Sequence, residues 1–168
     1  MLTIQCTKKL ASEILVPMAE VRENAHQSLY SWHAHLFLFK RKKYVLLMNN
    51  KTRYNFVLAG LKKEDFKKFN KIFLNNLAEN LQADQIDSEA IKAYVSNGNI
   101  VSYTSTSNRS IISQMNEMIM VSKSILEEDN MQGIETDLYE LNRFLNRFVM
   151  LKLPETYSGE AMRKVLSP

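Results

Sequence analysis

The side chains best suited to chemistry in this sequence are three histidines and one cysteine. His33 and His35 are two residues apart, so in a strand both would point to one face, about 6.5–7 Å apart. Neutral imidazoles at that spacing can bind zinc, with His26, Cys6 or a glutamate as the third ligand. The alternative, which we favour, is that His26, His33 and His35 are ordinary structural side chains and that the chain holds no metal.

Cys6 and the motif content of the chain indicate no catalytic centre. Cys6 alternates with apolar residues over 2–6, so we interpret it as a small buried strand residue rather than a nucleophile beside Lys8 and Lys9. The sequence contains no phosphate-binding glycine loop, serine-hydrolase elbow, HExxH motif or CxxC motif. We therefore name no catalytic residue and no cofactor. An enzyme is the less favoured alternative, and it would need the histidines or the segment 108–110 to line a pocket.

Asn108, Arg109 and Ser110 precede a predicted helix and form a candidate anion site. Exposed amides at a helix N-terminus suit phosphate, and an adjacent arginine would add charge. Asn and Ser are also ordinary capping residues, and Arg109 could pair with an acidic neighbour. Both interpretations stay open at this point.

Positive charge is concentrated in residues 40–71, which hold 11 of the 22 Lys and Arg and two acidic residues. Residues 127–140 hold six acidic residues and no basic one. We predict a nucleic-acid-associated protein whose candidate phosphate-binding side chains are Arg41, Lys42, Lys43, Lys67, Lys68 and Lys71. Tyr44 and Tyr54 would stack on unpaired bases. The alternative is that the basic and acidic segments face each other, or a second copy of the chain, and cancel.

A different function class also fits the sequence. The acidic segment 127–140 follows a helix rich in methionine, a residue common at adaptable protein surfaces. This pattern is typical of a protein-partner regulatory module, antitoxin-like or related to phage or defence systems, or of a homo-oligomer. The Phe66, Phe69 and Phe73 stripe and the Met115 and Met118 stripe are predicted to be core.

The elements that must position these residues follow from hydrophobic spacing. Alternation predicts short strands at 2–6 and 99–104. Three further strands are predicted to form an antiparallel meander with a basic hairpin tip, at 32–39, 44–48 and 54–59. Helical spacing predicts long helices at 61–81, 108–128 and 136–150. Strands followed by helices indicate an α+β fold, with an antiparallel sheet packed by several helices and no βαβ order.

Length and composition bound the remaining possibilities. The chain has 168 residues, of which 45% are hydrophobic and one is cysteine. This size and balance predict one domain over 1–168 without a disulfide framework. No apolar run approaches about 18 residues, so we expect no membrane span. The N-terminus does not read as a signal peptide, so we expect a cytoplasmic location.

Four short blocks, taken together in order and spacing, resemble a family of small prokaryotic proteins classed as a domain of unknown function. The blocks are QCTKKL at 5–10, WHA at 32–34, NRSIISQMN at 108–116 and LNRFLN at 141–146. The resemblance covers essentially the whole chain and implies one domain, a prokaryotic or phage source and a soluble protein. It implies no catalytic role, because the family has no established activity.

Overall fold

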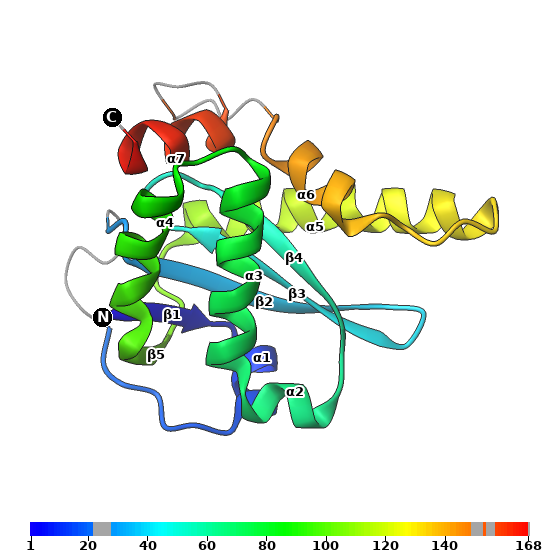
Figure 1. The fold of residues 1–168 in the computed structure, drawn as a ribbon. Helices are drawn as coiled ribbons and strands as arrows, with labels where there is room; N and C mark the ends of the chain where they lie inside the picture. Colours follow the sequence, from blue (N-terminus) through cyan, green and yellow to red (C-terminus); the bar gives the residue numbers. More distant parts are fainter. Residues whose placement is uncertain (22–27, 149–152, 154–156, 168) are drawn as a thin grey trace.

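A five-stranded mixed sheet forms the centre of the fold, with strand order β4-β3-β2-β1-β5. The computed structural model describes residues 1–21, 28–148, 153 and 157–167, and the structural statements below concern this part of the chain. The fold is α+β, with helices on both faces of the sheet (Figure 1). The strands are β1 (Leu2–Cys6), β2 (Ser31–Phe39), β3 (Lys42–Asn49), β4 (Asn55–Leu61) and β5 (Val101–Ser105).

Two hydrophobic cores, one on each face, explain how the helices divide. In β2, alternate side chains point to opposite faces, so Trp32 enters the larger core and Phe37 the smaller. The larger core is covered by α1 (Lys8–Ile14), α2 (Lys63–Lys67), α3 (Phe69–Ala83), α4 (Ser88–Val95) and α7 (Ser158–Leu166). The smaller core is covered by α5 (Arg109–Met131) and α6 (Leu138–Leu145). No described helix combines the length and apolarity needed to cross a membrane.

The predicted meander is right for three of the five strands. β2 pairs with β3 and β3 with β4, both antiparallel. The prediction of a wholly antiparallel sheet without βαβ order is wrong, because β1 pairs in parallel with both β2 and β5. The chain passes through α1 between β1 and β2, which is the kind of crossover that parallel neighbours require.

Two predicted helices differ in extent from those observed. The helix predicted at 61–81 starts later, because β4 continues to Leu61, and it is interrupted at Lys68, which has a φ of −121°. The helix predicted at 136–150 is α6 over part of that range, and 149–150 lie outside the described residues. The helix predicted at 108–128 is α5, which extends to Met131.

The larger core is organised around Trp32. Its ring meets Phe56 and Phe73 edge-on, with centroids 5.8 and 5.5 Å away, and its Nε1 donates to the Tyr94 hydroxyl at 3.0 Å. Phe69 and Phe73 are buried, as predicted, and so are Phe66, Met115 and Met118. The core thus holds the sheet against α3 and α4, and leaves the β2–β3 hairpin free to extend past it (Figure 1).

Candidate nucleic-acid interface

The β2–β3 hairpin turns through two residues, Lys40 and Arg41, because Phe39 pairs with Lys42. Both have positive φ, 50° and 66°, as a two-residue type I′ turn requires. Asn and Gly are favoured at such positions, because a β-carbon in this backbone region costs on the order of 1 kcal/mol. Two long cations therefore occupy a turn whose backbone disfavours them, and an outlier of this kind is a reason to look for function.

A hollow of about 340 Å³ lies beside this turn, and we call it the basic groove. Its lining comes from the beginning of β3 and from the end of β4 with the connection to α2. Among the described residues the lining contains five cations and no acidic side chain. The lining residues are Arg41, Lys42, Lys43, Gly60, Leu61, Lys62 and Lys63.

The antiparallel pairing of β3 with β4 builds the groove. Lys43 pairs with Leu61, and the register shifts between Lys43 and Val45, so β4 carries an extra residue there. Gly60, with a φ of 63°, lies at this bulge, where glycine is favoured and the strand bends. Lys62 and Lys63 follow Leu61 directly and so come beside the turn end of the β2–β3 hairpin.

Most of the positive charge in the groove is not neutralised by the protein. Lys43 is the exception, because its Nζ lies 2.6 Å from Glu13 Oε1 and 5.9 Å from the centre of the Phe66 ring. The other four cations make no ion pair within the described part of the chain. The carboxylate of nearby Asp65 accepts the Lys62 backbone N–H at 2.7 Å, and it forms no ion pair with the described cations of the groove.

The lysines predicted on the helix lie outside the groove lining. Lys67 Nζ pairs with Glu64 at 3.3 Å, and both side chains are well exposed. Lys68 and Lys71 are exposed around the break between α2 and α3. Their part in binding stays a prediction, and the structure brings only Arg41, Lys42 and Lys43 of the predicted set together in the groove.

The expected base-stacking role of Tyr54 is wrong. Tyr54 is fully buried, and its hydroxyl donates to the Asp84 carboxylate. Burial, with the Asp84 charge beside it, raises its pKa well above the ordinary range. Tyr44 is also largely buried and stacks on Phe37 with centroids 5.3 Å apart, but it lines a second hollow, on the α5 side of the hairpin.

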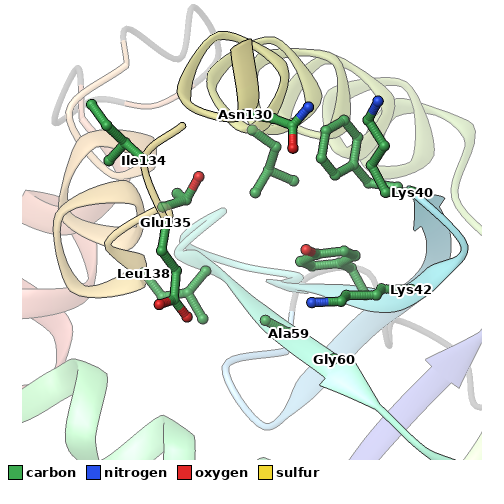
Figure 2. A pocket seen from close by; sticks show the side chains of 12 residues that line it. Lys40, Lys42, Ala59, Gly60, Asn130, Ile134, Glu135 and Leu138 are labelled. Carbon is green, nitrogen blue, oxygen red and sulfur yellow. The ribbon is translucent and has the colours of Figure 1, made fainter. Parts of the chain in front are cut away.

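This second hollow, which we call the hairpin pocket, has a volume of about 350 Å³. Figure 2 shows Lys40 and Lys42 on one side, Ile134, Glu135 and Leu138 on the other, and Asn130 of α5 above. Lys42 and Gly60 line both the pocket and the basic groove, so the two hollows adjoin. The remaining lining residues are Phe39, Tyr44, Ala59, Leu126 and Thr136.

The acidic segment 127–140 comes beside the hairpin lysines at the hairpin pocket. Glu135 shares the hairpin pocket with Lys40 and Lys42, but none of the ion pairs among the described residues joins them. The acidic partners that Lys43 and Lys67 do have lie elsewhere in the sequence. Within the described part of the chain, no acidic side chain of 127–140 forms an ion pair with a cation of 40–71.

The first three sequence blocks converge on a buried polar cluster between the sheet and α5. His33 Nδ1 is 2.8 Å from Asn50 Oδ1, Asn50 Nδ2 donates to Gln5 Oε1 at 2.7 Å, and Gln5 Nε2 donates to Ser107 Oγ at 2.9 Å. Arg53 joins Gln114 of α5 to this cluster. Burial lowers the pKa of His33 to about 4, so its imidazole is neutral near pH 7. The cluster ties α5 to the sheet.

His35 and Cys6 have structural surroundings. His35 points to the same face of β2 as His33, as predicted, and its Nδ1 lies 2.8 Å from Thr7 Oγ1. Cys6 is buried in β1, and burial raises its pKa to about 12, which keeps the thiol protonated. Within the described residues no three His, Cys, Asp or Glu side chains could share a metal ion, and His26 lies outside that part of the chain.

Asn108 caps α5, as its residue type predicts. Its Oδ1 accepts the Ile111 backbone N–H at 2.9 Å, while Arg109 is exposed. Capping therefore accounts for Asn108, and anion binding at Asn108, Arg109 and Ser110 stays a prediction.

Sequence reasoning missed Lys62 and Lys63, although a usable signal was present. In an antiparallel meander the end of the third strand lies beside the beginning of the second. Two lysines that follow the third predicted strand after Gly60 and Leu61 should therefore meet Lys42 and Lys43. Asn130 and Glu135 carry no such signal, because they reach the hairpin only through the packing of α5.

Comparison with known proteins identifies a family whose function is not known. A family model described as "Domain of unknown function (DUF6933)" matches residues 3–159. A search of curated proteins found no significant match.

Proposed function

The chain belongs to this family of domains of unknown function, and we propose that it binds the phosphate backbone of nucleic acid through the basic groove. The proposal is supported above all by Arg41, Lys42, Lys62 and Lys63, which reach one hollow from two segments and have no acidic partner within the described residues. A nucleic-acid partner and the sequence-based expectations together favour the cytoplasm of a prokaryotic cell.

Phosphodiesters match this groove better than a small metabolite would. Exposed lysine and arginine side chains are flexible, and they bind phosphates by releasing condensed counterions, without reading sequence. A linear polyanion can contact cations from both segments at once, which separates it from a single phosphate ion. The two unfavourable residues in the hairpin turn support this assignment, because they place an arginine at the groove.

The test compares two double variants that remove the same charge. Lys62→Ser/Lys63→Ser removes two groove cations, and Lys92→Ser/Lys164→Ser removes two exposed lysines of α4 and α7 outside it. Binding of a labelled single-stranded oligonucleotide is measured by fluorescence anisotropy at about 50 mM salt. The groove variant should lose roughly 70-fold in affinity. Two contacts contribute a log–log slope of about −1.4, and the salt concentration falls about 20-fold from 1 M, where the electrostatic contribution vanishes, to about 50 mM.

The control variant should lose much less, since its lysines do not line the groove. Equal losses in the two variants would show that overall charge, rather than the groove, carries the binding. An unmodified protein that binds neither single-stranded nor duplex nucleic acid at low salt would overturn the proposed function.

A protein partner is the second candidate, favoured by exposed methionines on α5. Met120 and Met131 are 72% and 77% exposed, and methionine is enriched in protein interfaces. The far end of α5 also extends beyond the sheet, where a partner could reach it (Figure 1). A partner that stays bound in a pull-down after nuclease treatment, and is lost in Met120→Ser/Met131→Ser, would support this alternative.

A further inference from the structure

We infer that the hairpin pocket accepts one unpaired base of a strand bound in the basic groove, so that single strands bind more tightly than duplexes. The inference rests on the proposed function, because the groove supplies the phosphate contacts. It adds a second contact surface and a substrate class that groove charge alone does not specify.

The basic groove and the hairpin pocket lie next to each other, so one strand can reach both. Lys42 and Gly60 line both, and Lys40 lies on the pocket side of the turn while Arg41 lies on the groove side. An ideal β-carbon at Gly60 would meet no atom within 4 Å, so the backbone borders open space there. A strand whose phosphates lie on the groove cations can therefore direct a neighbouring base across the hairpin into the pocket.

The pocket has the composition that a base requires. Its apolar lining comes from Phe39, Tyr44, Leu126 and Leu138, and the Tyr44 ring is fixed in place by stacking on Phe37 at an interplanar angle of 16°. Aromatic and apolar walls suit the flat face of any base. A volume of about 350 Å³ lies at the small end of ligand pockets, which suits one ring system.

The polar side chains of the pocket lie where the edge of a base would reach. Glu135 belongs to the wall opposite the hairpin lysines, and Asn130 of α5 lies above the pocket (Figure 2). A carboxylate accepts hydrogen bonds from an exocyclic amine, such as that of cytosine, and it has no donor for the O4 acceptor that thymine carries at the same position. Lys40 and Lys42, at the other side, would meet the phosphates flanking the inserted base. The pocket therefore favours an amine-bearing base, which must be unpaired to enter.

The test uses two oligonucleotides with the same number of phosphates, one of deoxycytidines and one carrying abasic residues. The unmodified protein should bind the abasic strand roughly 5- to 150-fold more weakly, the range expected for losing one stacked base. Ala59→Phe fills the pocket from β4 and should remove this difference, while the salt dependence of binding stays. Glu135→Gln keeps the pocket volume and should reduce the preference for deoxycytidine over thymidine strands.

The outcomes separate this inference from the proposed function. Equal binding of the intact and abasic strands by the unmodified protein would overturn the inference and leave the groove proposal standing. Absence of all binding would overturn both. If the intact strand keeps its advantage in folded Ala59→Phe, the base is held elsewhere and the inference is wrong. If Ala59→Phe does not fold, the exposed Glu135→Gln variant decides, because an unchanged base preference contradicts the inference.

Discussion

The side-chain amide of Asn142 hydrogen-bonds the backbone of Val57 as a neighbouring strand would. Its Oδ1 accepts the Val57 N–H at 2.8 Å, and its Nδ2 lies 3.5 Å from the Val57 carbonyl oxygen. One helical turn later, Asn146 Oδ1 accepts the Asn55 N–H at 2.9 Å and its Nδ2 donates to the Asn55 carbonyl at 2.7 Å. β4 is an edge strand of the sheet, so α6 closes part of an edge that would otherwise be open to pairing.

Asn142→Ala should therefore destabilise the fold by about 1–3 kcal/mol, because it leaves the buried backbone groups of Val57 without a partner. Urea denaturation measures the change. Glu140→Ala, on the exposed side of α6, is the matched control and should stay within about 0.5 kcal/mol of the unmodified protein. An Asn142→Ala midpoint equal to that of the control would contradict the stabilising role of this pair.

Stability should fall on acidification because of His33. Burial lowers the pKa of His33 to about 4, whereas in the unfolded chain it is near 6.5. The unfolded state then takes up a proton first as the pH drops below about 6.5, so the contribution is complete above that pH and is lost toward pH 4. Between about pH 7 and pH 5 this amounts to about 2 kcal/mol.

The measurement compares urea unfolding of the unmodified protein and His33→Gln at both pH values. The variant is less stable at neutral pH but should lose less stability on acidification. Parallel pH profiles for the two proteins would show that the pKa of His33 is the same in the folded and unfolded states, which contradicts this account.

Substitution of the two residues of the hairpin turn should raise the stability of the fold and weaken oligonucleotide binding. Lys40→Asn/Arg41→Gly places the residues preferred in a type I′ turn at two positions of positive φ. Folding should gain about 1 kcal/mol, which raises the melting temperature by about 2–4 °C in a protein of this size. Oligonucleotide affinity should fall in the same variant, since a groove cation is lost. A variant that is more stable and binds as tightly as before would remove Arg41 from the interface.

Phe73 should be among the most costly side chains to truncate. It is fully buried between Trp32 and Phe56, with ring centroids 5.5 and 6.2 Å away. Phe73→Ala should cost about 3–5 kcal/mol, because the lost contacts leave a cavity in a close-packed core. Thermal or urea unfolding checks this against Phe144→Ala on the exposed face of α6. A similar, small effect of both substitutions would show that the face assigned to α3 is wrong.

The local sequence pattern predicted which segments form helices and strands better than it predicted which strands lie side by side. Runs of aromatic and aliphatic residues identified β2, β3 and β4, and short polar connections made their antiparallel order predictable. The alternation in β1 shows which side chains share a face but not which strand lies alongside, so its parallel pairing with β2 and β5 could not be predicted. The break at Lys68 also escaped prediction, because the apolar stripe of Phe66, Phe69 and Phe73 reads as one continuous helix.

The residues of the candidate site likewise differ in how far the local sequence predicts them. Arg41, Lys42 and Lys43 were predictable as a hairpin tip, because a run of cations interrupts a strand pattern. Lys62 and Lys63 needed the register of the meander as well. Glu135 reaches the hairpin from about 90 residues away in sequence through the packing of α5 on the sheet, which no local pattern encodes.

The salt dependence of oligonucleotide binding tests the central proposal most directly. Four groove cations, each neutralising one phosphate of a single strand, predict a log–log slope of about −3 for the unmodified protein. Lys62→Ser/Lys63→Ser should reduce that slope by about 1.4, with little change in melting temperature, since exposed charges contribute little to stability. A slope near zero in the unmodified protein, or one that the double substitution leaves unchanged, would contradict phosphate binding in the basic groove.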